Sequence, residues 1–440
     1  MVRITSIHKE YQTLAYSPVG MGLDKETGWG TLLFSASRAC TRSCYGCWTN
    51  QVGSLIRQQL ASGSQWLYDG RYELDVLSSL LSSFKDNGGR LVALMNDGET
   101  LDRRNYDFVL KLAEHVGDID LPLLLFTFGG ELNNEKIQEL GKAAKGKVSY
   151  SISIQTGDLD RYGYQMITML DGDPERQKRI GRKTMEEEVY GNFNDWREHD
   201  AEVLEKTGKH GIGIHTYVND RTTREDLESL EEIAKKLGNV PQTITSWGVH
   251  VKDTLIGRQA KLQNSGLLEE FKTGPTADLI FGDKEGDIIC SYIAHGHYSF
   301  SREKKGVFGI TFHPYERGQL QTCPYHRDIG TREWLALRDY LDVMKENEQQ
   351  ITDEHIGRWL ENAVKAETMI TTAAFDLTGY EHCLMRHSRK PEIDLFISGV
   401  NNEMAKRRRD GKLDVKDKEY FDNVIAELNE TIKGILNQNG

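Results

Sequence analysis

The feature that most constrains this chain is the stretch CTRSCYGC at residues 40–47, which holds three of the six cysteines in the sequence. Thiolates spaced this closely can bind one metal centre. A structural zinc site normally has four protein ligands, whereas three thiolates can hold a cubane iron–sulfur cluster and leave its fourth iron open. The spacing therefore predicts a 4Fe-4S cluster with Cys40, Cys44 and Cys47 as its metal ligands.

Composition sets the class of protein. The chain has 440 residues, 38% of them hydrophobic and 28% charged, which is typical of a soluble globular protein large enough for a barrel and an extension. No apolar run is long enough to cross a bilayer, so we expect no membrane anchor. The net charge of −12 argues against a nucleic-acid partner. We interpret the basic run 406–409 as a solvated helix face.

Cysteine usage and the N-terminal residues predict the compartment. Six cysteines, three of them clustered, form a sparse disulfide framework for 440 residues and fit metal binding in a reducing environment. Residues 1–10 lack the continuous apolar segment of a secretory signal. We therefore expect a cytoplasmic protein.

Apolar strand-like runs alternate with amphipathic helical runs over the first 250 residues. Strands are predicted at 30–35, 91–95, 123–126, 148–154, 211–218 and 243–249, and helices at 72–86, 105–116, 133–144 and 223–237. This alternation is typical of parallel βα units whose sheet is covered by helices. The predicted fold class is α/β, a partial (β/α)6 TIM-type barrel followed by a small α+β module and C-terminal helices.

Two local features refine this prediction. The connection at 156–195 is much longer than an ordinary βα loop, so we expect an inserted helical element near the site. The helix at 223–237 is predicted to begin at a capping box of Thr222 and Glu225 and to end at Gly238.

The βα pattern ends near residue 260, and this change predicts the domain boundaries. Residues 277–290 suggest two short strands around a turn, with further strand pieces at 306–312 and 319–323. Helical spacing returns beyond residue 331. The predicted domains are an N-terminal leader at 1–29, the barrel at 30–258, the small module at 259–330 and a helical extension at 331–440.

The cysteine loop resembles the hallmark C-x₃-C-x₂-C motif of the radical S-adenosylmethionine (radical SAM) superfamily, which follows the first strand of a partial α/β barrel. This sequence departs from the family at one position. An aromatic residue usually precedes the last cysteine, and Gly46 stands there instead, with Tyr45 one place earlier. The resemblance implies that Tyr45 contacts the cofactor, that S-adenosylmethionine (SAM) binds the open iron, and that a flavodoxin or ferredoxin supplies electrons.

The family also carries a Gly-Gly-Glu-like turn after its second strand, which receives the SAM ammonium group. Two segments are candidates, Asp97-Gly98-Glu99 after the second predicted strand and Gly129-Gly130-Glu131 after the third. Adjacent parallel strands bring their carboxyl ends together, so position in the strand order favours Asp97, Gly98 and Glu99. We interpret Gly129-Gly130 as a turn.

Polar residues at the ends of the fourth and fifth strands complete the predicted cofactor site. The resemblance gives Ser153 and Gln155 as partners of the SAM ribose, although a polar strand end satisfied by water is an equal alternative. His215 and Asn219 are candidates for adenosine or substrate, and a structural role for a strand histidine is the more frequent one.

Three further cysteines, Cys290, Cys323 and Cys383, follow the barrel. Their placement loosely resembles the SPASM and twitch extensions of radical SAM enzymes, which bind an auxiliary cluster. A second 4Fe-4S cluster held by these cysteines is therefore one hypothesis, with His326, His382 or His387 as a further ligand. Three unrelated buried cysteines are the alternative at equal weight.

The resemblance implies an enzyme, an oxidoreductase-type radical catalyst that cleaves SAM reductively and abstracts a hydrogen atom from its substrate. We expect a small metabolite or nucleoside as substrate, because no N-terminal peptide-recognition domain is evident. Modification of a peptide or protein side chain is the alternative. A non-catalytic zinc or iron–sulfur protein is the alternative of another class.

Overall fold

The computed structural model describes residues 31–36, 40, 42, 44, 63–95, 98–166, 172–218, 221–246, 277–280, 309–314, 317–321 and 336–378, together with the single positions 423 and 426. The described elements divide into two compact units, and the division falls within strand β1. The first unit holds the parallel strands and the helices α4 to α9. The second holds α3, the strands β8 and β9, and the helices α13 and α14.

Among the described residues, seven strands lie in the spatial order β1 to β7, and each neighbouring pair from β2 to β7 is parallel. They are β1 (Thr31–Phe34), β2 (Leu91–Leu94), β3 (Leu123–Thr127), β4 (Val148–Ser153), β5 (Ile212–Val218), β6 (Gln242–Ser246) and β7 (Ala277–Ile280). All described residues of β1, β2 and β3 are buried, as expected for strands covered on both faces. The sheet is not closed, which confirms the predicted partial barrel.

Strand β7 is the main difference from the sequence prediction. Residues 277–290 suggested two short strands in a separate module, but Ala277–Ile280 pairs in parallel with β6 and extends the barrel sheet by one strand. Four residues are too few to reveal which sheet a strand joins. The remainder of that segment lies outside the described residues.

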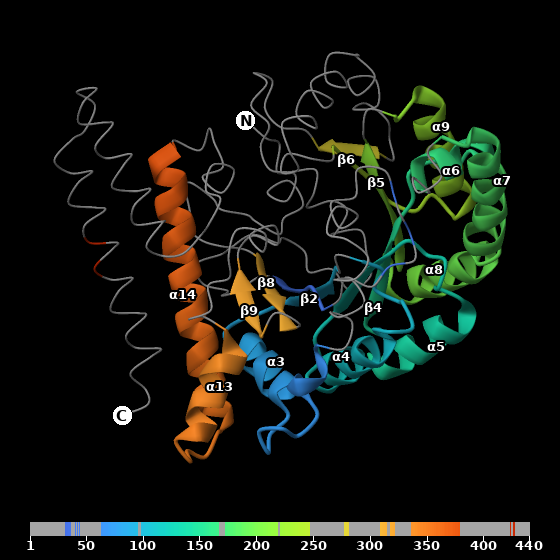
Figure 1. Ribbon diagram of the computed structural model, residues 1–440. Coiled ribbons are helices and arrows are strands. Elements are labelled where there is room, and N and C mark those ends of the chain that lie inside the picture. The colour runs from blue at the N-terminus through green and yellow to red at the C-terminus, as the bar shows by residue number, and fades with distance from the viewer. Residues whose placement is uncertain are drawn as a thin grey trace, which may run out of the picture. The chain divides into compact units, whose positions relative to one another are not determined.

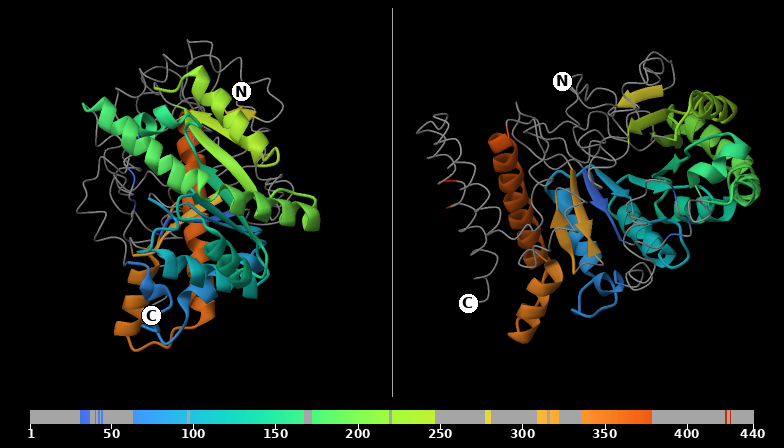
Figure 2. Two further views of the ribbon diagram at one scale, coloured as in Figure 1. Left: turned by 90° about the vertical axis from the view of Figure 1, so that its right-hand side faces the viewer. Right: turned by 45° about the horizontal axis from the view of Figure 1, so that its top comes forward.

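Helices follow the strands of the first unit and lie on one side of them (Figure 1). They are α4 (Tyr106–Asp118), α5 (Asn134–Ala143), α6 (Leu159–Met166), α7 (Pro174–Met185), the π-helix η5 (Glu186–Tyr190), α8 (Phe193–Thr207) and α9 (Arg224–Lys236). Helices α6 to α8 confirm the predicted helical insertion after β4. Figure 2 shows the same elements from two further directions.

Helix α9 begins one residue later than its sequence signal suggested. Its capping box uses Thr223 and Asp226, not Thr222 and Glu225. Asp226 also accepts two hydrogen bonds from Arg161, at 2.7 and 2.8 Å. The sequence offered two overlapping pairs of capping residues, and the buried ion pair selects the second because it satisfies the Asp226 carboxylate inside the protein.

The second unit packs around a buried aromatic pair. It contains the short 3₁₀ turn η3 (Gln65–Leu67), α3 (Val76–Asp86), the antiparallel hairpin of β8 (Gly309–His313) and β9 (Gln319–Gln321), α13 (Leu337–Glu346) and α14 (Asp353–Thr378). Phe312 and Trp359 meet edge to face with ring centroids 6.2 Å apart. Ser79 of α3 donates a 2.6 Å hydrogen bond to Asp353, which joins α3 to the start of α14.

Within the described residues, no helix is long and apolar enough to span a membrane. The predicted terminal helix around Phe421–Ile432 lies almost wholly outside the described residues. The predicted domain boundaries at 29, 258 and 330 stay predictions.

Replacing Asp226 by Ala removes one of the two hydrogen bonds of the capping box, the one that Asp226 accepts from the Thr223 N–H, and leaves Arg161 without its carboxylate partner. We expect the free energy of unfolding to fall by about 2–4 kcal/mol, because the lost half of the capping box adds to the penalty of a broken, partly buried ion pair. Urea denaturation followed by circular dichroism measures the change. Glu202→Ala is the control, because it breaks only the exposed ion pair with Lys206 and should change stability little. Equal effects of the two substitutions would contradict this role for Asp226.

Candidate active site

The cysteine loop begins where β1 ends, beside the end of β2. The backbone N–H of Met95 donates a 3.0 Å hydrogen bond to the carbonyl of Phe34, so the two strand ends remain paired. The Ser64 hydroxyl donates to the carbonyl of Ala36 at 3.0 Å and fixes the chain just before the loop. Cys40 and Cys44 are half-buried, and the backbone N–H of Arg42 donates to the Cys40 Sγ at 3.3 Å. A backbone N–H directed at sulfur stabilises a thiolate, which is the form that binds metal.

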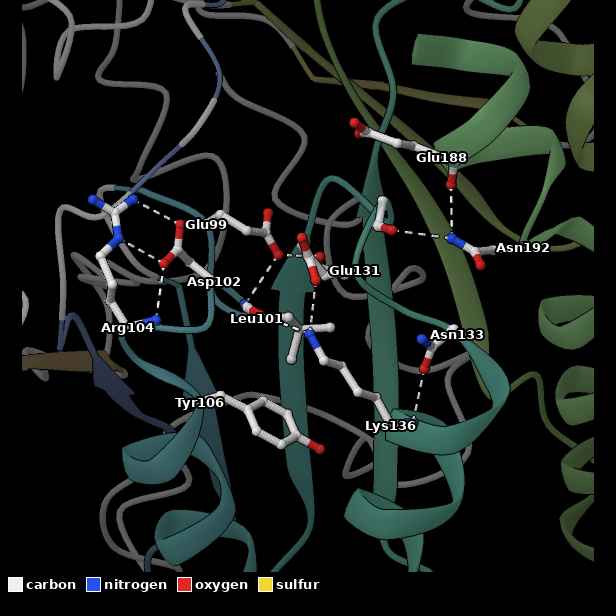
Figure 3. Close-up of polar contacts among 12 residues, drawn as sticks. Glu99, Leu101, Asp102, Arg104, Tyr106, Glu131, Asn133, Lys136, Glu188 and Asn192 are labelled. Carbon is white, nitrogen blue, oxygen red and sulfur yellow. Dashed lines mark hydrogen bonds and ion pairs between the residues drawn. The ribbon is translucent and has the colours of Figure 1, made fainter. Parts of the chain in front are cut away.

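Glu99 is the buried carboxylate at the end of β2, with only 3% of its surface exposed. Three donors hold it. The Phe128 N–H reaches Oε2 at 2.9 Å, the Leu101 N–H reaches Oε1 at 3.0 Å, and the Thr127 hydroxyl also donates to Oε1. Two of these donors follow or end β3, so the neighbouring parallel strand orients the carboxylate (Figure 3).

Burial raises the pKa of Glu99 from 4.5 to about 7, against the lowering effects of the three hydrogen bonds and of the nearby Arg42 charge. Burial disfavours the charged form of Glu99. A cationic ligand bound beside the carboxylate would offset this cost and is therefore favourable at this position. This environment fits the ammonium-receiving role that the sequence assigned to Glu99. Gly98 stands beside it, and Asp97 lies outside the described residues.

A second charged pair lies in the loop that follows Glu99. Asp102 accepts two hydrogen bonds of 2.8 Å from the guanidinium of Arg104 in a bidentate arrangement (Figure 3). The pKa of Arg104 is raised, first by Asp102 and also by the charge of Cys40. Arg104 is therefore within electrostatic reach of the cysteine loop and favours the thiolate of Cys40.

Arg42 is the residue of this region that sequence reasoning missed. Its side chain is 6% exposed and forms an ion pair with Glu188 of the π-helix η5. The guanidinium carbon lies 4.4 Å from the centre of the Phe128 ring and 5.7 Å from that of Tyr162. The sequence placed Arg42 inside the motif, but no local pattern connects it to a glutamate in the distant insertion.

The alternative turn Gly129-Gly130-Glu131 has a structural role. Gly129 has a φ of +87°, a conformation that favours glycine, and a side chain there would meet Trp196. The Leu132 N–H donates to the Gly129 carbonyl at 2.9 Å and closes the turn. Glu131 is exposed and forms a 2.9 Å ion pair with Lys136 (Figure 3). This carboxylate lacks the burial that distinguishes Glu99.

The polar residues predicted after β4 lie at the carboxyl end of the same sheet. Ser153 is half-buried and is in register with His215 of β5, while Gln155 is 7% exposed. His215 is fully buried and packs against Phe126, with ring centroids 5.8 Å apart. This packing supports the structural interpretation of His215.

Several predicted site residues lie outside the described residues. They are Tyr45, Cys47, Asp97, Asn219, Cys290, His326, Cys323, His382, Cys383 and His387. The described donors fit an iron–sulfur cluster, because two thiols follow β1, the backbone N–H of Arg42 donates to the Cys40 Sγ, and the Arg104 charge interacts with Cys40. Such surroundings stabilise thiolate ligands.

The fold and this site define a partial-barrel protein with a thiolate loop after its first strand and a buried carboxylate after its second. Residues 34–230 match the radical SAM superfamily. These residues therefore form a radical SAM domain, as the cysteine motif predicted. No curated protein sequence matches the chain.

Solved structures that are similar to the chain over part of its length include SuiB from Streptococcus suis. Its structure bound to S-adenosylmethionine is 13% identical, with 68% of this chain and 61% of that chain covered and a TM-score of 0.43. Its structure bound to the precursor peptide SuiA is also 13% identical, with 74% and 63% covered and a TM-score of 0.40. Methylornithine synthase (PylB) is 12% identical, with 56% and 58% covered and a TM-score of 0.29. The chain thus spans less than two thirds of the length of each of these proteins.

The raised pKa of Glu99 predicts a pH dependence of stability in the metal-free protein. Between pH 4.5 and about 7 the folded state holds a proton that the unfolded state has lost. Stability therefore falls as the pH rises through this window and is constant above it, with a total loss of about 3 kcal/mol from this group.

Urea denaturation of the wild type and Glu99→Gln at several pH values measures this contribution. The difference in unfolding free energy between the two proteins should shift in favour of the Gln variant as the pH rises from 4.5 to 8. Glu131→Gln is the control and should keep the pH dependence of the wild type. A parallel pH dependence for wild type and Glu99→Gln would show that Glu99 is not desolvated.

Proposed function

We propose that this protein is a radical SAM enzyme in which Cys40, Cys44 and Cys47 hold a 4Fe-4S cluster and Glu99 receives the ammonium group of SAM. A bound cluster with SAM would supply reductive cleavage of the sulfonium and an adenosyl radical for hydrogen abstraction. The observation that carries the proposal is the buried carboxylate of Glu99, fixed at the end of β2 next to the strand that delivers the cysteine loop.

Different residues of the chain would hold different parts of the cluster and of SAM. The three hydrogen bonds to Glu99 fix its two oxygens before a ligand arrives, which reduces the cost of ordering the site. Arg104 and the Arg42 N–H favour the thiolate form of Cys40. Ser153 and Gln155 are proposed to bind the ribose hydroxyls, and Tyr45 the adenine.

For the substrate we propose a small metabolite or nucleoside. The helical insertion reaches the cysteine loop through the ion pair of Glu188 with Arg42, and we propose that it restricts the access of a polypeptide to the site. A peptide side chain remains the second candidate. Extracts of cells grown in deuterated medium distinguish them when they are freed of endogenous SAM, separated into small-molecule and polypeptide fractions and supplied with unlabelled SAM. Deuterium then enters 5′-deoxyadenosine only from the fraction that contains the substrate.

Replacing Glu99 by Ala should weaken SAM binding to the reconstituted protein by about 1.5–3 kcal/mol, the range for a hydrogen bond to a charged group. Isothermal titration with SAM measures the affinity, and iron analysis shows whether the cluster is retained. Glu131→Ala is the matched control, because this exposed carboxylate belongs to the other candidate turn and should leave SAM affinity unchanged. Weaker binding in Glu131→Ala together with normal binding in Glu99→Ala would reverse the assignment.

An auxiliary cluster on Cys290, Cys323 and Cys383 stays a proposal, because all three cysteines lie outside the described residues. If these cysteines bind a second 4Fe-4S cluster, the reconstituted protein should hold about eight irons per chain. The variant with Cys40, Cys44 and Cys47 all changed to Ala should then retain about four. Iron and sulfide analysis of both proteins measures the number of irons per chain. An iron-free variant would mean that the later cysteines do not bind a cluster.

A further inference from the structure

The side chain of Arg42 makes contacts well outside the cysteine loop to which it belongs. It stands between Cys40 and Cys44, yet its side chain is 6% exposed and extends toward two other parts of the barrel. Its guanidinium lies over the ring of Phe128, which follows β3, and near the ring of Tyr162 in α6. Its ion-pair partner, Glu188, belongs to the π-helix between α7 and α8.

Two neighbouring residues, Gly130 and Asn192, help to hold Glu188 in this position. A side chain at Gly130 would meet both the Glu188 carboxylate and the Phe128 ring, so the glycine leaves room for the pair. Asn192 donates one hydrogen bond to the Glu188 carbonyl at 2.9 Å and another to the Gly130 carbonyl at 3.2 Å (Figure 3). The turn after β3 and the π-helix are thereby joined. π-helical turns of this kind occur frequently at functional sites.

Burying a guanidinium is costly, and one partly exposed carboxylate offsets only part of that cost. Glu188 is 35% exposed, whereas Arg42 is almost fully desolvated. The Arg42 charge also acts on Glu99 and so extends to the proposed SAM site. A loop that needed only anchoring would be stabilised at lower cost by an apolar residue against Phe128 and Tyr162. The cost of burying the positive charge of Arg42 therefore suggests that the charge has a function of its own.

We propose that Arg42 is a positioning residue that anchors the cysteine loop to the insertion through Glu188 and carries a positive charge between two of the cysteines, which would favour the reduced form of a cluster held by this loop. This inference rests on the proposed function. Reduction adds one electron, taken from a donor protein of the flavodoxin or ferredoxin class, and breaks no bond. The cluster gains one negative charge, which Arg42 attracts and Glu188 repels.

The two members of the pair should therefore shift the reduction potential in opposite directions. Arg42→Met keeps the length and the apolar contacts of the side chain but removes its charge, so the potential should fall. Glu188→Gln keeps the shape of the partner and removes the opposing charge, so the potential should rise. Redox titration of the anaerobically reconstituted proteins, followed by electron paramagnetic resonance, measures both shifts, and iron analysis gives the cluster content.

Arg161→Met is the matched control. Arg161 forms a buried ion pair with Asp226 in the same unit and also lies near an aromatic ring, that of Tyr164. Its loss should destabilise the fold without shifting the potential. A shift in Arg161→Met as large as that in Arg42→Met would overturn the proposal, because destabilisation alone would then explain the effect.

The Glu188→Gln variant keeps the test decisive if Arg42→Met does not retain iron. A higher potential in Glu188→Gln at full iron content supports the proposal, and an unchanged or lower potential overturns it. Shifts of the same sign in both variants would also overturn it, because opposite charges cannot act electrostatically in one direction. A wild-type protein that binds no cluster would instead refute the proposed function, and this result is distinguishable by its iron content.

Discussion

The parallel pairing of β2, β3 and β4 is the constraint on which the site depends. Because the register runs without interruption from Val92 beside Leu123 to Thr127 beside Ile152, the carboxyl ends of these strands lie at one edge of the sheet. Each following loop must then place its first residues at that edge. Glu99 and Phe128 come together for this reason, although the helix α4 separates them in the sequence, and the end of β4 lies at the same edge.

Charge at this edge is costly, and the structure compensates for it locally. Glu99 is satisfied by donors from its own loop and from β3, and Arg42 by Glu188 and two aromatic rings. Asp102 and Arg104 form a bidentate pair in the loop that follows. These groups are held before any cofactor binds, which is the preorganisation that radical chemistry requires of its protein.

The sequence predicted the barrel strands well because continuous apolar runs, such as Leu91–Leu94 and Leu123–Thr127, are typical of strands in a sheet that is buried on both faces. It selected Glu99 over Glu131 from strand order alone, and this choice stays a prediction, while the structure shows that Glu99 is buried and Glu131 exposed. It predicted a short strand near β7 but placed it in a separate module, because a four-residue strand carries no signal of its partner. It also missed Glu188, since a long-range ion pair leaves no periodic pattern in the chain.

The most direct test of the central claim is the formation of 5′-deoxyadenosine from SAM by the anaerobically reconstituted and reduced protein. The account predicts that the wild type forms it and that the variant with Cys40, Cys44 and Cys47 replaced by Ala forms none. Equal formation of 5′-deoxyadenosine by that variant and the wild type would contradict the account, because the chemistry would then not depend on the cysteine loop.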